Sequence, residues 1–283
     1  MLLLSETRHN DRSVEVSVVA TFMSSNMSPN VLRVGWSIMT SLVTVRSPDP
    51  RGHETADHGR FAKILEQLES DVIRRLPDVV EELDAYLDEM AVIDPDRLDR
   101  DEALAFWINV YNAAALRVGA HAARDGEPTV FGLPGAFTSP AILVSGEELS
   151  IDQVEHGKIR RFRDPRIHAG LVCGAMSCPT LRREPYTGEV DRELDDQMRQ
   201  FLASGALRLD PSANEVVLSP IFAWFGRDFV KPHRMPTLLP ARRRSVLRAL
   251  GVWVDDETVK WIEDVEPSIT FSGYDWRLAC SIG

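Results

Sequence analysis

The sequence predicts an α/β domain, with α+β as the alternative, in which helices flank a small central β-sheet. Apolar residues recur at helical spacing in several stretches, the longest of them over residues 100–123. A short apolar run over residues 167–173 has the length and composition of a buried strand. Residues 207–209 and 216–218 alternate around a polar turn and predict a hairpin. Together these patterns predict a mixed helix and sheet protein.

Length, charge and cysteine usage narrow the class of protein. The chain has 283 residues, which allows one large domain or two modest ones. Its net charge of -11 disfavours binding to nucleic acid and to anionic membranes. No apolar run approaches the ~20 residues of a membrane span, so we expect no stable membrane insertion. Three cysteines are an odd count in a chain that needs no disulfide framework, and this favours the cytoplasm.

The first part of the chain differs from the rest. Residues 1–56 are rich in Ser, Thr, Met and Val without clear periodicity, and we expect a poorly ordered N-terminal extension there. Two prolines and a glycine within residues 47–52 predict a linker. Residues 57–283 are expected to form a single domain.

Helices dominate the first half of that domain. Apolar residues over 61–68 follow helical spacing, and a second helix is expected over 78–90 with Pro77 at its entry. The long apolar helix over residues 100–123 begins with Asp101 and Glu102, which suit the positive end of the helix dipole.

Two amides interrupt the apolar character of that long helix. Asn109 and Asn112 are three residues apart and therefore share a face. Buried amides need hydrogen-bond partners. The two asparagines either tie neighbouring loops to the core, or orient a catalytic side chain or a substrate amide.

The remaining elements follow in order. A strand is expected over residues 141–144, and Ser150 with Gln153 forms a capping box that opens a helix over 151–161. After the predicted strand over 167–173, the chain breaks at Gly174 into a loop that ends in Ser177, Cys178 and Pro179. The further expectations are helices over 190–202, 220–225, 242–250 and 256–262, the hairpin, and a last strand over 268–271.

Cys178 is the candidate nucleophile. If a helix begins at Pro179, the thiol occupies its N-cap, where the dipole favours the reactive thiolate. His156 or His168 would act as the base, and Asn109 or Asn112 would orient it. A strand from His168 to Cys173 would span about 16 Å, at roughly 3.3 Å per residue, which makes His156 the preferred base.

A zinc site is the alternative use of the same residue types. His156, His168, Cys173 and Cys178 could supply ligands. Side chains alternate along a strand, so His168 and Cys173 would point to opposite faces, and no tight Cys-x-x-Cys pair is present. We therefore expect no metal and no cofactor, and we interpret Cys173 as a small buried core residue.

Four ordered segments, over residues 105–113, 149–156, 164–179 and 274–276, resemble the family known as domain of unknown function 547, found in bacteria and plants. The resemblance spans about residues 60 to 280. It departs from the family at Ala169 and Gly170, where Phe-Ala is usual, and over residues 277–279, which read Arg-Leu-Ala where Ser-Leu-Asn is common, so any role of that terminal Asn is absent. The parts of the site also resemble those of papain-like and transglutaminase-like enzymes, in a different chain order.

Two functional hypotheses follow. The first is a cysteine-dependent hydrolase or acyltransferase that acts on an amide or thioester of a small-molecule or peptide substrate. Its candidate catalytic residues are Cys178, His156, His168, Asn109 and Asn112, and its candidate substrate contacts are Tyr111, Glu155, Arg166 and Ser177. The second is a noncatalytic module that binds a peptide or a small ligand in a pocket formed by the same histidines and asparagines.

Overall fold

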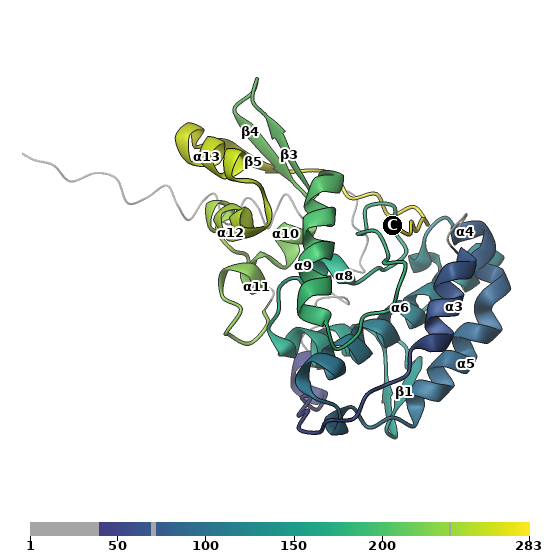
Figure 1. The fold of residues 1–283 in the computed structure, drawn as a ribbon. Helices are drawn as coiled ribbons and strands as arrows, with labels where there is room; N and C mark the ends of the chain where they lie inside the picture. Colours follow the sequence, from purple (N-terminus) through teal and green to yellow (C-terminus); the bar gives the residue numbers. More distant parts are fainter. Residues whose placement is uncertain (1–39, 69–71, 238) are drawn as a thin grey trace, which may run out of the picture.

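The computed structural model describes residues 40–68, 72–237 and 239–283, and its centre is one long helix. Helix α6, Arg100–Arg124, begins at Asp99, whose carboxylate accepts the backbone N–H groups of Asp101 and Glu102 at 2.9 and 3.0 Å. Such capping satisfies donors that have no partner inside the helix. Most side chains of α6 are buried, because other elements pack around it on several sides (Figure 1).

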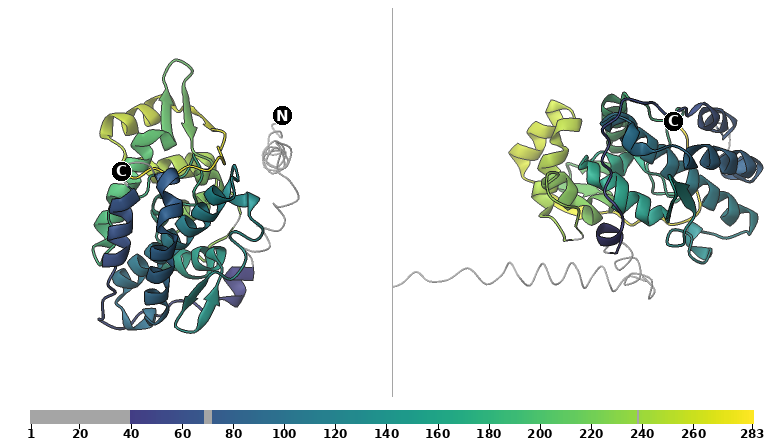
Figure 2. Two further views of the ribbon diagram at one scale, coloured as in Figure 1. Left: turned by 90° about the vertical axis from the view of Figure 1, so that its right-hand side faces the viewer. Right: turned by 90° about the horizontal axis from the view of Figure 1, so that it is seen from below.

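Helices from both halves of the chain pack against α6. From the first half come the short α4 (Val72–Arg75) and α5 (Val80–Ala91), and α3 (Gly59–Leu68) packs on these two helices; the three form one end of the molecule in Figure 2. From the second half comes α9, Val190–Phe201, which also packs on the short helix α8, Ile167–Gly170. The predicted helices over 61–68, 78–90, 100–123 and 190–202 are therefore confirmed.

Two small sheets complete the mixed architecture, which confirms the predicted fold class. Strands β1 (Ile142–Val144) and β2 (Glu147–Leu149) form an antiparallel hairpin. Strand β3 (Leu207–Asp210) pairs antiparallel with β4 (Glu215–Leu218), and β5 (Ser268–Phe271) lies parallel to β4. Helices flank these small sheets as expected, but α6 occupies the centre of the molecule. The likeness to papain-like and transglutaminase-like proteins stays a prediction.

The second half of the chain has its own apolar core at the other end of the molecule (Figure 2). Beside the three-stranded sheet lie α12 (Arg243–Leu250) and α13 (Asp256–Val265), with the short helices α10 (Ile221–Trp224) and α11 (Gly226–Val230). Buried residues of this core include Met198, Phe222, Val246 and Leu250.

The segment after β2 begins with the expected capping box. Ser150 Oγ accepts the N–H of Gln153 at 3.1 Å, and the Gln153 side chain accepts the N–H of Ser150 at 2.8 Å. Helix α7, Ile151–Gln153, continues into a π-helical turn, Val154–Lys158, and a 3-10 turn, Ile159–Phe162. The predicted helical extent is correct, and the irregular turns re-aim the side chains of Glu155 and His156.

The strand predicted over residues 167–173 is wrong. Ile167–Gly170 is one helical turn, and residues 171–173 are extended without a strand partner in the described structure. The Asn112 side chain takes the backbone bonds that a neighbouring strand would have taken, at Gly170 O and Val172 N–H. A short buried apolar run does not distinguish these conformations.

The helix expected at Pro179 is also wrong, so Cys178 does not occupy a helix N-cap. No helix begins between Cys178 and α9. The chain pairs there with the C-terminal segment instead: Leu181 N–H donates to Ser281 O at 2.8 Å, and Leu181 forms a bridge with Ile282.

Part of the predicted N-terminal extension contacts the domain. Residues 1–39 lie outside the described residues. In residues 40–56, the N–H groups of Arg51 and Gly52 donate to Asp96 O and Leu98 O, each at 3.0 Å. Val45 is buried beside Gly157. The domain boundary at residue 57 stays a prediction.

No helix in the described ranges is long and apolar enough to cross a membrane.

Candidate functional site

Two cysteine thiols meet in the loop that follows α8. The chain doubles back at Gly174, whose φ is 83°. Glycine adopts this conformation readily because it has no side chain. Cys178 N–H donates to Ala175 O at 3.0 Å and closes the turn. The Sγ atoms of Cys173 and Cys178 then lie 2.7 Å apart, and both cysteines are free thiols. Cys173 packs against the apolar core, in line with its interpretation as a core residue, and its thiol also belongs to this pair.

A tyrosine from the far end of the chain completes the thiol site. The Tyr274 hydroxyl lies 3.3 Å from Cys178 Sγ and 3.8 Å from Cys173 Sγ. Ser177 holds this segment in place: its N–H donates to Asp275 O at 3.2 Å, and its Oγ accepts the N–H of Asp275 at 2.9 Å. The C-terminal segment, yellow in Figure 1, runs back from β5 along this loop. Ser177 therefore positions Tyr274.

Hydrogen bonds make Cys178 the more acidic thiol of the pair. Burial alone raises its pKa, but the Cys173 thiol, the Tyr274 hydroxyl and the backbone N–H groups of Ala175 and Cys173 stabilise the thiolate. The net effect lowers the Cys178 pKa to about 7. The same hydrogen bond to Cys178, together with burial, raises the pKa of Cys173 well above its ordinary value. At pH 7, about half of the molecules therefore carry a Cys178 thiolate beside a protonated Cys173.

Aromatic rings surround the Tyr274 side of the site. The rings of Trp224 and Trp276 lie 4.8 and 4.3 Å from the Tyr274 ring, between centroids, and 5.6 Å from each other. These contacts restrict the Tyr274 ring and favour one position of its hydroxyl beside the sulfur atoms.

The two predicted histidines both lie near the ring of Phe225. His168 stacks on the Phe225 ring at 4.1 Å with an interplanar angle of 9°. Its Nε2 lies 3.0 Å from Asp228 Oδ2. His156 lies 6.3 Å from the Phe225 ring, between centroids. Burial lowers the pKa of both imidazoles, so both are neutral at pH 7.

An arginine links the two histidines in one buried network. Arg160 donates to both carboxylate oxygens of Asp228, at 2.8 and 3.0 Å, and its Nη1 lies 3.4 Å from His156 Nδ1. Despite the cost of burial, His168 and Arg160 hold the pKa of Asp228 at about 2. Within the described ranges, neither imidazole makes a hydrogen bond to the sulfur of Cys178. The structure therefore pairs His168 with Asp228, places His156 beside Arg160 and Glu155, and pairs the Cys178 thiol with Cys173 and Tyr274.

A buried phenol and a largely buried carboxyl, those of Tyr111 and Glu155, are hydrogen-bonded to each other. The Tyr111 hydroxyl donates to Glu155 Oε2 at 3.2 Å. Burial raises the Tyr111 pKa well above its ordinary value, and the charge of Glu155 adds to this effect. Burial raises the Glu155 pKa to about 7, against an opposing effect of Arg160. Glu155 can therefore exchange a proton near neutral pH.

The two asparagines bind backbone. Asn109 donates to Tyr186 O at 2.8 Å and accepts the N–H of Tyr186 at 2.9 Å. Asn112 makes the corresponding pair with Gly170 O and Val172 N–H, both at 3.0 Å. Each amide thus holds one loop against α6, and neither contacts a sulfur atom or an imidazole in the described structure.

Arg166 lies in an ion cluster with helix α9. Its guanidinium donates to Asp164 Oδ2 at 2.7 Å and to Asp191 Oδ1 at 2.6 Å. These carboxylates raise its pKa. No described contact joins Arg166 to the thiol pair, and its substrate contact stays a prediction.

Sequence reasoning missed three members of this region. Tyr274 stands in a segment already singled out for its family resemblance, and that was the available signal. Arg160 and Asp228 carry no local signal, because their pairing joins residues 68 positions apart.

The fold and site define an α/β protein with a pair of free thiols and a central helix that bears two buried asparagines. Residues 95–202 match the model of the family described as "Protein of unknown function, DUF547". This match includes α6 and both thiols of the pair, and it confirms the resemblance to that family over these residues. Searches of curated proteins and of solved structures found no match.

Proposed function

We propose that the protein is a cysteine-dependent hydrolase or acyltransferase that acts on thioesters, with Cys178 as its nucleophile. One observation carries this assignment: the Cys178 Sγ lies 3.3 Å from the hydroxyl of Tyr274 and 2.7 Å from Cys173 Sγ, and in the described structure it makes no hydrogen bond to an imidazole. A thiol whose pKa lies near the ambient pH combines a large thiolate fraction with high intrinsic nucleophilicity. Cys178 thus needs no base to attack a carbonyl.

Because Cys178 makes no hydrogen bond to an imidazole in the described structure, one of the two expected substrate classes is favoured over the other. An amide releases an amine, which must be protonated by a general acid as it leaves. A thioester releases a thiolate, which leaves without that proton. Among the amide and thioester substrates expected from the sequence, this geometry favours the thioester.

The reaction has two steps. Cys178 Sγ attacks the thioester carbonyl, the carbon–sulfur bond of the substrate breaks, and the leaving thiolate takes the electron pair, which leaves the acyl group on Cys178. Water in a hydrolase, or an acceptor in a transferase, then attacks this acyl-enzyme and restores the Cys178 thiolate. We assign the acceptance of the proton in this second step to Glu155, whose pKa of about 7 suits a general base.

The test is acylation by S-phenyl thioacetate, followed by intact-protein mass spectrometry. We expect a mass increase of one acetyl group in the native chain and in Cys280→Ser, the matched control, and none in Cys178→Ser. Acetanilide, the corresponding amide, should give no acetylation. Acetylation of Cys178→Ser, or equal reaction with thioester and amide, would contradict the assignment.

Iodoacetamide labelling reports the thiolate directly. Cys178 should be alkylated fastest, with a pH midpoint near its pKa of about 7. Burial raises the Cys280 pKa to about 12, and Cys173 also has a raised pKa, so both should react slowly. Equal, slow labelling of all three cysteines would remove the basis for a nucleophile.

The 2.7 Å distance between the two Sγ atoms favours thiol–disulfide exchange as a second candidate function. Cys178 would attack a small-molecule disulfide and form a mixed disulfide, which Cys173 would resolve. The substrate disulfide is thereby reduced to two thiols, and the cysteine pair loses two electrons and forms a disulfide. Oxidised glutathione distinguishes the two functions: rapid release of glutathione without acylation by thioester favours exchange.

The noncatalytic binding module is the outcome that remains if neither reaction occurs and ligand binding survives Cys178→Ser. We also propose a cytoplasmic location, where the three free thiols stay reduced, and a small-molecule or peptide substrate rather than nucleic acid.

A further inference from the structure

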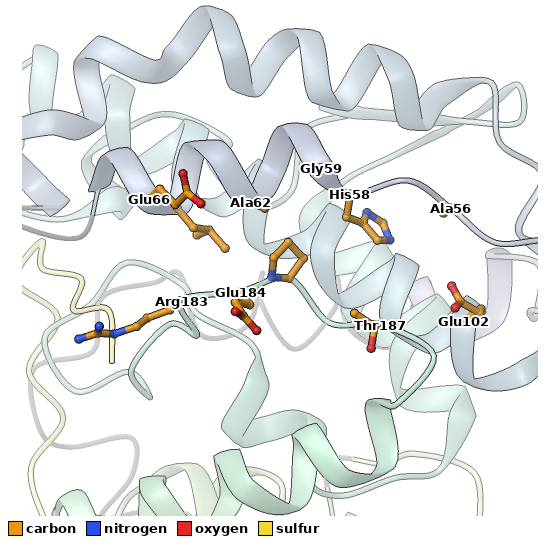
Figure 3. Close-up of a pocket in the computed structure, with 11 residues that line it drawn as sticks. Ala56, His58, Gly59, Ala62, Glu66, Glu102, Arg183, Glu184 and Thr187 are labelled. Carbon is orange, nitrogen blue, oxygen red and sulfur yellow. The ribbon is translucent and has the colours of Figure 1, made fainter.

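A cavity of about 570 Å³ lies apart from the thiol pair, between α3 and the segment over residues 183–187 (Figure 3). Helix α6 contributes Glu102 at one end, and Leu65 and Pro185 supply apolar walls. Its volume falls in the range of sites that enclose small organic ligands, about 300–1,000 Å³, and far exceeds the space that a metal ion needs.

One wall carries a buried histidine with an unused nitrogen. His58 is 9% exposed, and its Nδ1 lies 2.8 Å from the hydroxyl of Tyr86. His58 Nε2 has no hydrogen-bond partner in the described structure, and the imidazole lies at the cavity in Figure 3. A buried polar atom without a partner costs about 1–3 kcal/mol, so this nitrogen favours a ligand that would pair with it.

The tyrosine fixes the role of that nitrogen. Burial raises the Tyr86 pKa, so its hydroxyl keeps its proton at pH 7, and burial lowers the His58 pKa to about 4, so the imidazole is neutral. The buried hydroxyl is satisfied when it donates to His58 Nδ1. The imidazole proton then resides on Nε2, which is a donor that requires an oxygen acceptor.

The charges around the cavity favour a cation. Three carboxyl groups line it, from Glu66, Glu102 and Glu184, against the single guanidinium of Arg183. Glu66 and Glu184 are exposed, whereas Glu102 is half-buried and accepts the backbone N–H groups of Ala56 and Gly188. Figure 3 shows Glu66, Glu184 and Arg183 toward one end and Glu102 toward the other, with His58 between them.

The loop that forms the opposite wall is held in place before any ligand arrives. Tyr186 lies between Pro185 and Thr187, and its backbone N–H and C=O are both bonded to the Asn109 side chain. Preorganisation of this kind reduces the entropy lost on binding. Asn109 is therefore a positioning residue for this wall.

We propose that this cavity binds a small organic amine that also carries a carbonyl acceptor and an apolar side chain, the chemistry of an amino-acid amide or a peptide N-terminus. The ammonium lies among the carboxylates, the carbonyl oxygen accepts the proton of His58 Nε2, and the apolar group packs against Leu65 and Pro185. This site goes beyond the proposed thioester chemistry and does not depend on it.

Calorimetric titration of the full chain with L-leucinamide tests the proposal. At pH 6.5 the ligand amine, with an α-amino pKa of about 7.7–8.0, is mostly charged. We expect saturable binding, and binding at least about tenfold weaker, or about 1.4 kcal/mol, for N-acetyl-leucinamide and for isoamylamine. The first analogue lacks the charge and the second lacks the carbonyl.

Variants locate the binding. The double substitution Glu66→Gln with Glu184→Gln should weaken leucinamide binding about tenfold or more. The same charge change at the exposed Glu257 of α13, together with a second unrelated surface carboxylate, should leave it unchanged. His58→Asn retains an acceptor for Tyr86 but removes the donor at the Nε2 position, and should weaken leucinamide binding without weakening isoamylamine binding.

Three results would overturn the proposal. The first is no binding of leucinamide at concentrations up to about 10 mM. The others are equal affinity for leucinamide and its acetylated analogue, and unchanged affinity in the double Glu variant. Displacement of leucinamide by Ca²⁺ with tighter binding of Ca²⁺ would identify a cation site instead. Cys178→Ser separates the two proposals, because it should abolish acylation and leave leucinamide binding intact.

Discussion

Replacement of Tyr274 by phenylalanine removes one hydroxyl donor from the Cys178 thiolate and leaves the ring in its aromatic group. The hydroxyl lies 3.3 Å from Cys178 Sγ. A hydrogen bond to a charged group contributes about 1.5–3 kcal/mol. Since about 1.4 kcal/mol corresponds to one pKa unit, its loss should raise the Cys178 pKa by about 1–2 units. From a pKa of about 7, the variant should titrate between about 8 and 9.

The assay is the pH dependence of iodoacetamide alkylation at Cys178, followed by peptide mass spectrometry. At pH 7 the thiolate fraction should fall from about one half to roughly 1–10%, because the pKa moves above the pH. A more basic thiolate is intrinsically more nucleophilic, which offsets part of the change in rate. The midpoint of the pH profile, rather than the rate at one pH, therefore measures the hydrogen bond.

Tyr186→Phe is the matched control. The Tyr186 hydroxyl is buried without a hydrogen-bond partner in the described structure, so its removal should leave the Cys178 midpoint near 7. A midpoint in Tyr274→Phe equal to that of the native chain would refute the role of the hydroxyl. A shift of the same size in Tyr186→Phe would show that the effect is not specific to the contact.

The other expectations concern stability. Burial raises the Glu155 pKa from 4.5 to about 7, so the folded chain loses stability as the pH rises between these values. The free energy of unfolding of Glu155→Gln, measured in urea, should equal that of the native chain at pH 4 and exceed it by about 2–3 kcal/mol at pH 8. Asn112→Leu leaves the backbone groups Gly170 C=O and Val172 N–H without their partner, and should lower the free energy of unfolding by about 2–5 kcal/mol and shift the Cys178 alkylation midpoint. Asn109→Leu should lower the free energy of unfolding by as much without shifting that midpoint. Gly157→Ala places a Cβ 2.6 Å from both Cβ and Cγ1 of Val45 and should lower stability by about 1–3 kcal/mol. Val45→Gly, which removes both of these atoms, should make the added cost of Gly157→Ala disappear in the double variant; no loss in the single Gly157→Ala variant would contradict this packing.

Local patterns in the sequence predicted the elements whose causes are local. The acidic first turn and apolar body of α6, the capping box at Ser150 and the β3–β4 hairpin all depend on neighbours within a few residues. Residues 167–173 are different: their backbone bonds go to a side chain about 60 positions earlier, so no periodicity within the run could indicate the outcome.

The candidate site was predicted by residue type better than by arrangement. Cys178 was identified, but the expected strand kept Cys173 away from it, whereas Gly174 with its φ of 83° brings the two sulfur atoms together. The histidines are expected beside the thiol; the described structure bonds His168 to Asp228 and shows no hydrogen bond between either imidazole and Cys178. Tyr274 arrives from about 100 residues away, which is a tertiary contact that sequence spacing does not encode.

The closing segment of the chain has a consequence for how the protein comes into being. Backbone bonds from Met176 to Arg277 and from Leu181 to Ser281 fasten the loop that bears both cysteines. Because synthesis proceeds from the N-terminus, the helices around α6 can form on the ribosome before this closing segment has emerged. Until residues 277–281 have been synthesised, these bonds cannot form, and the loop that bears both cysteines lacks their support.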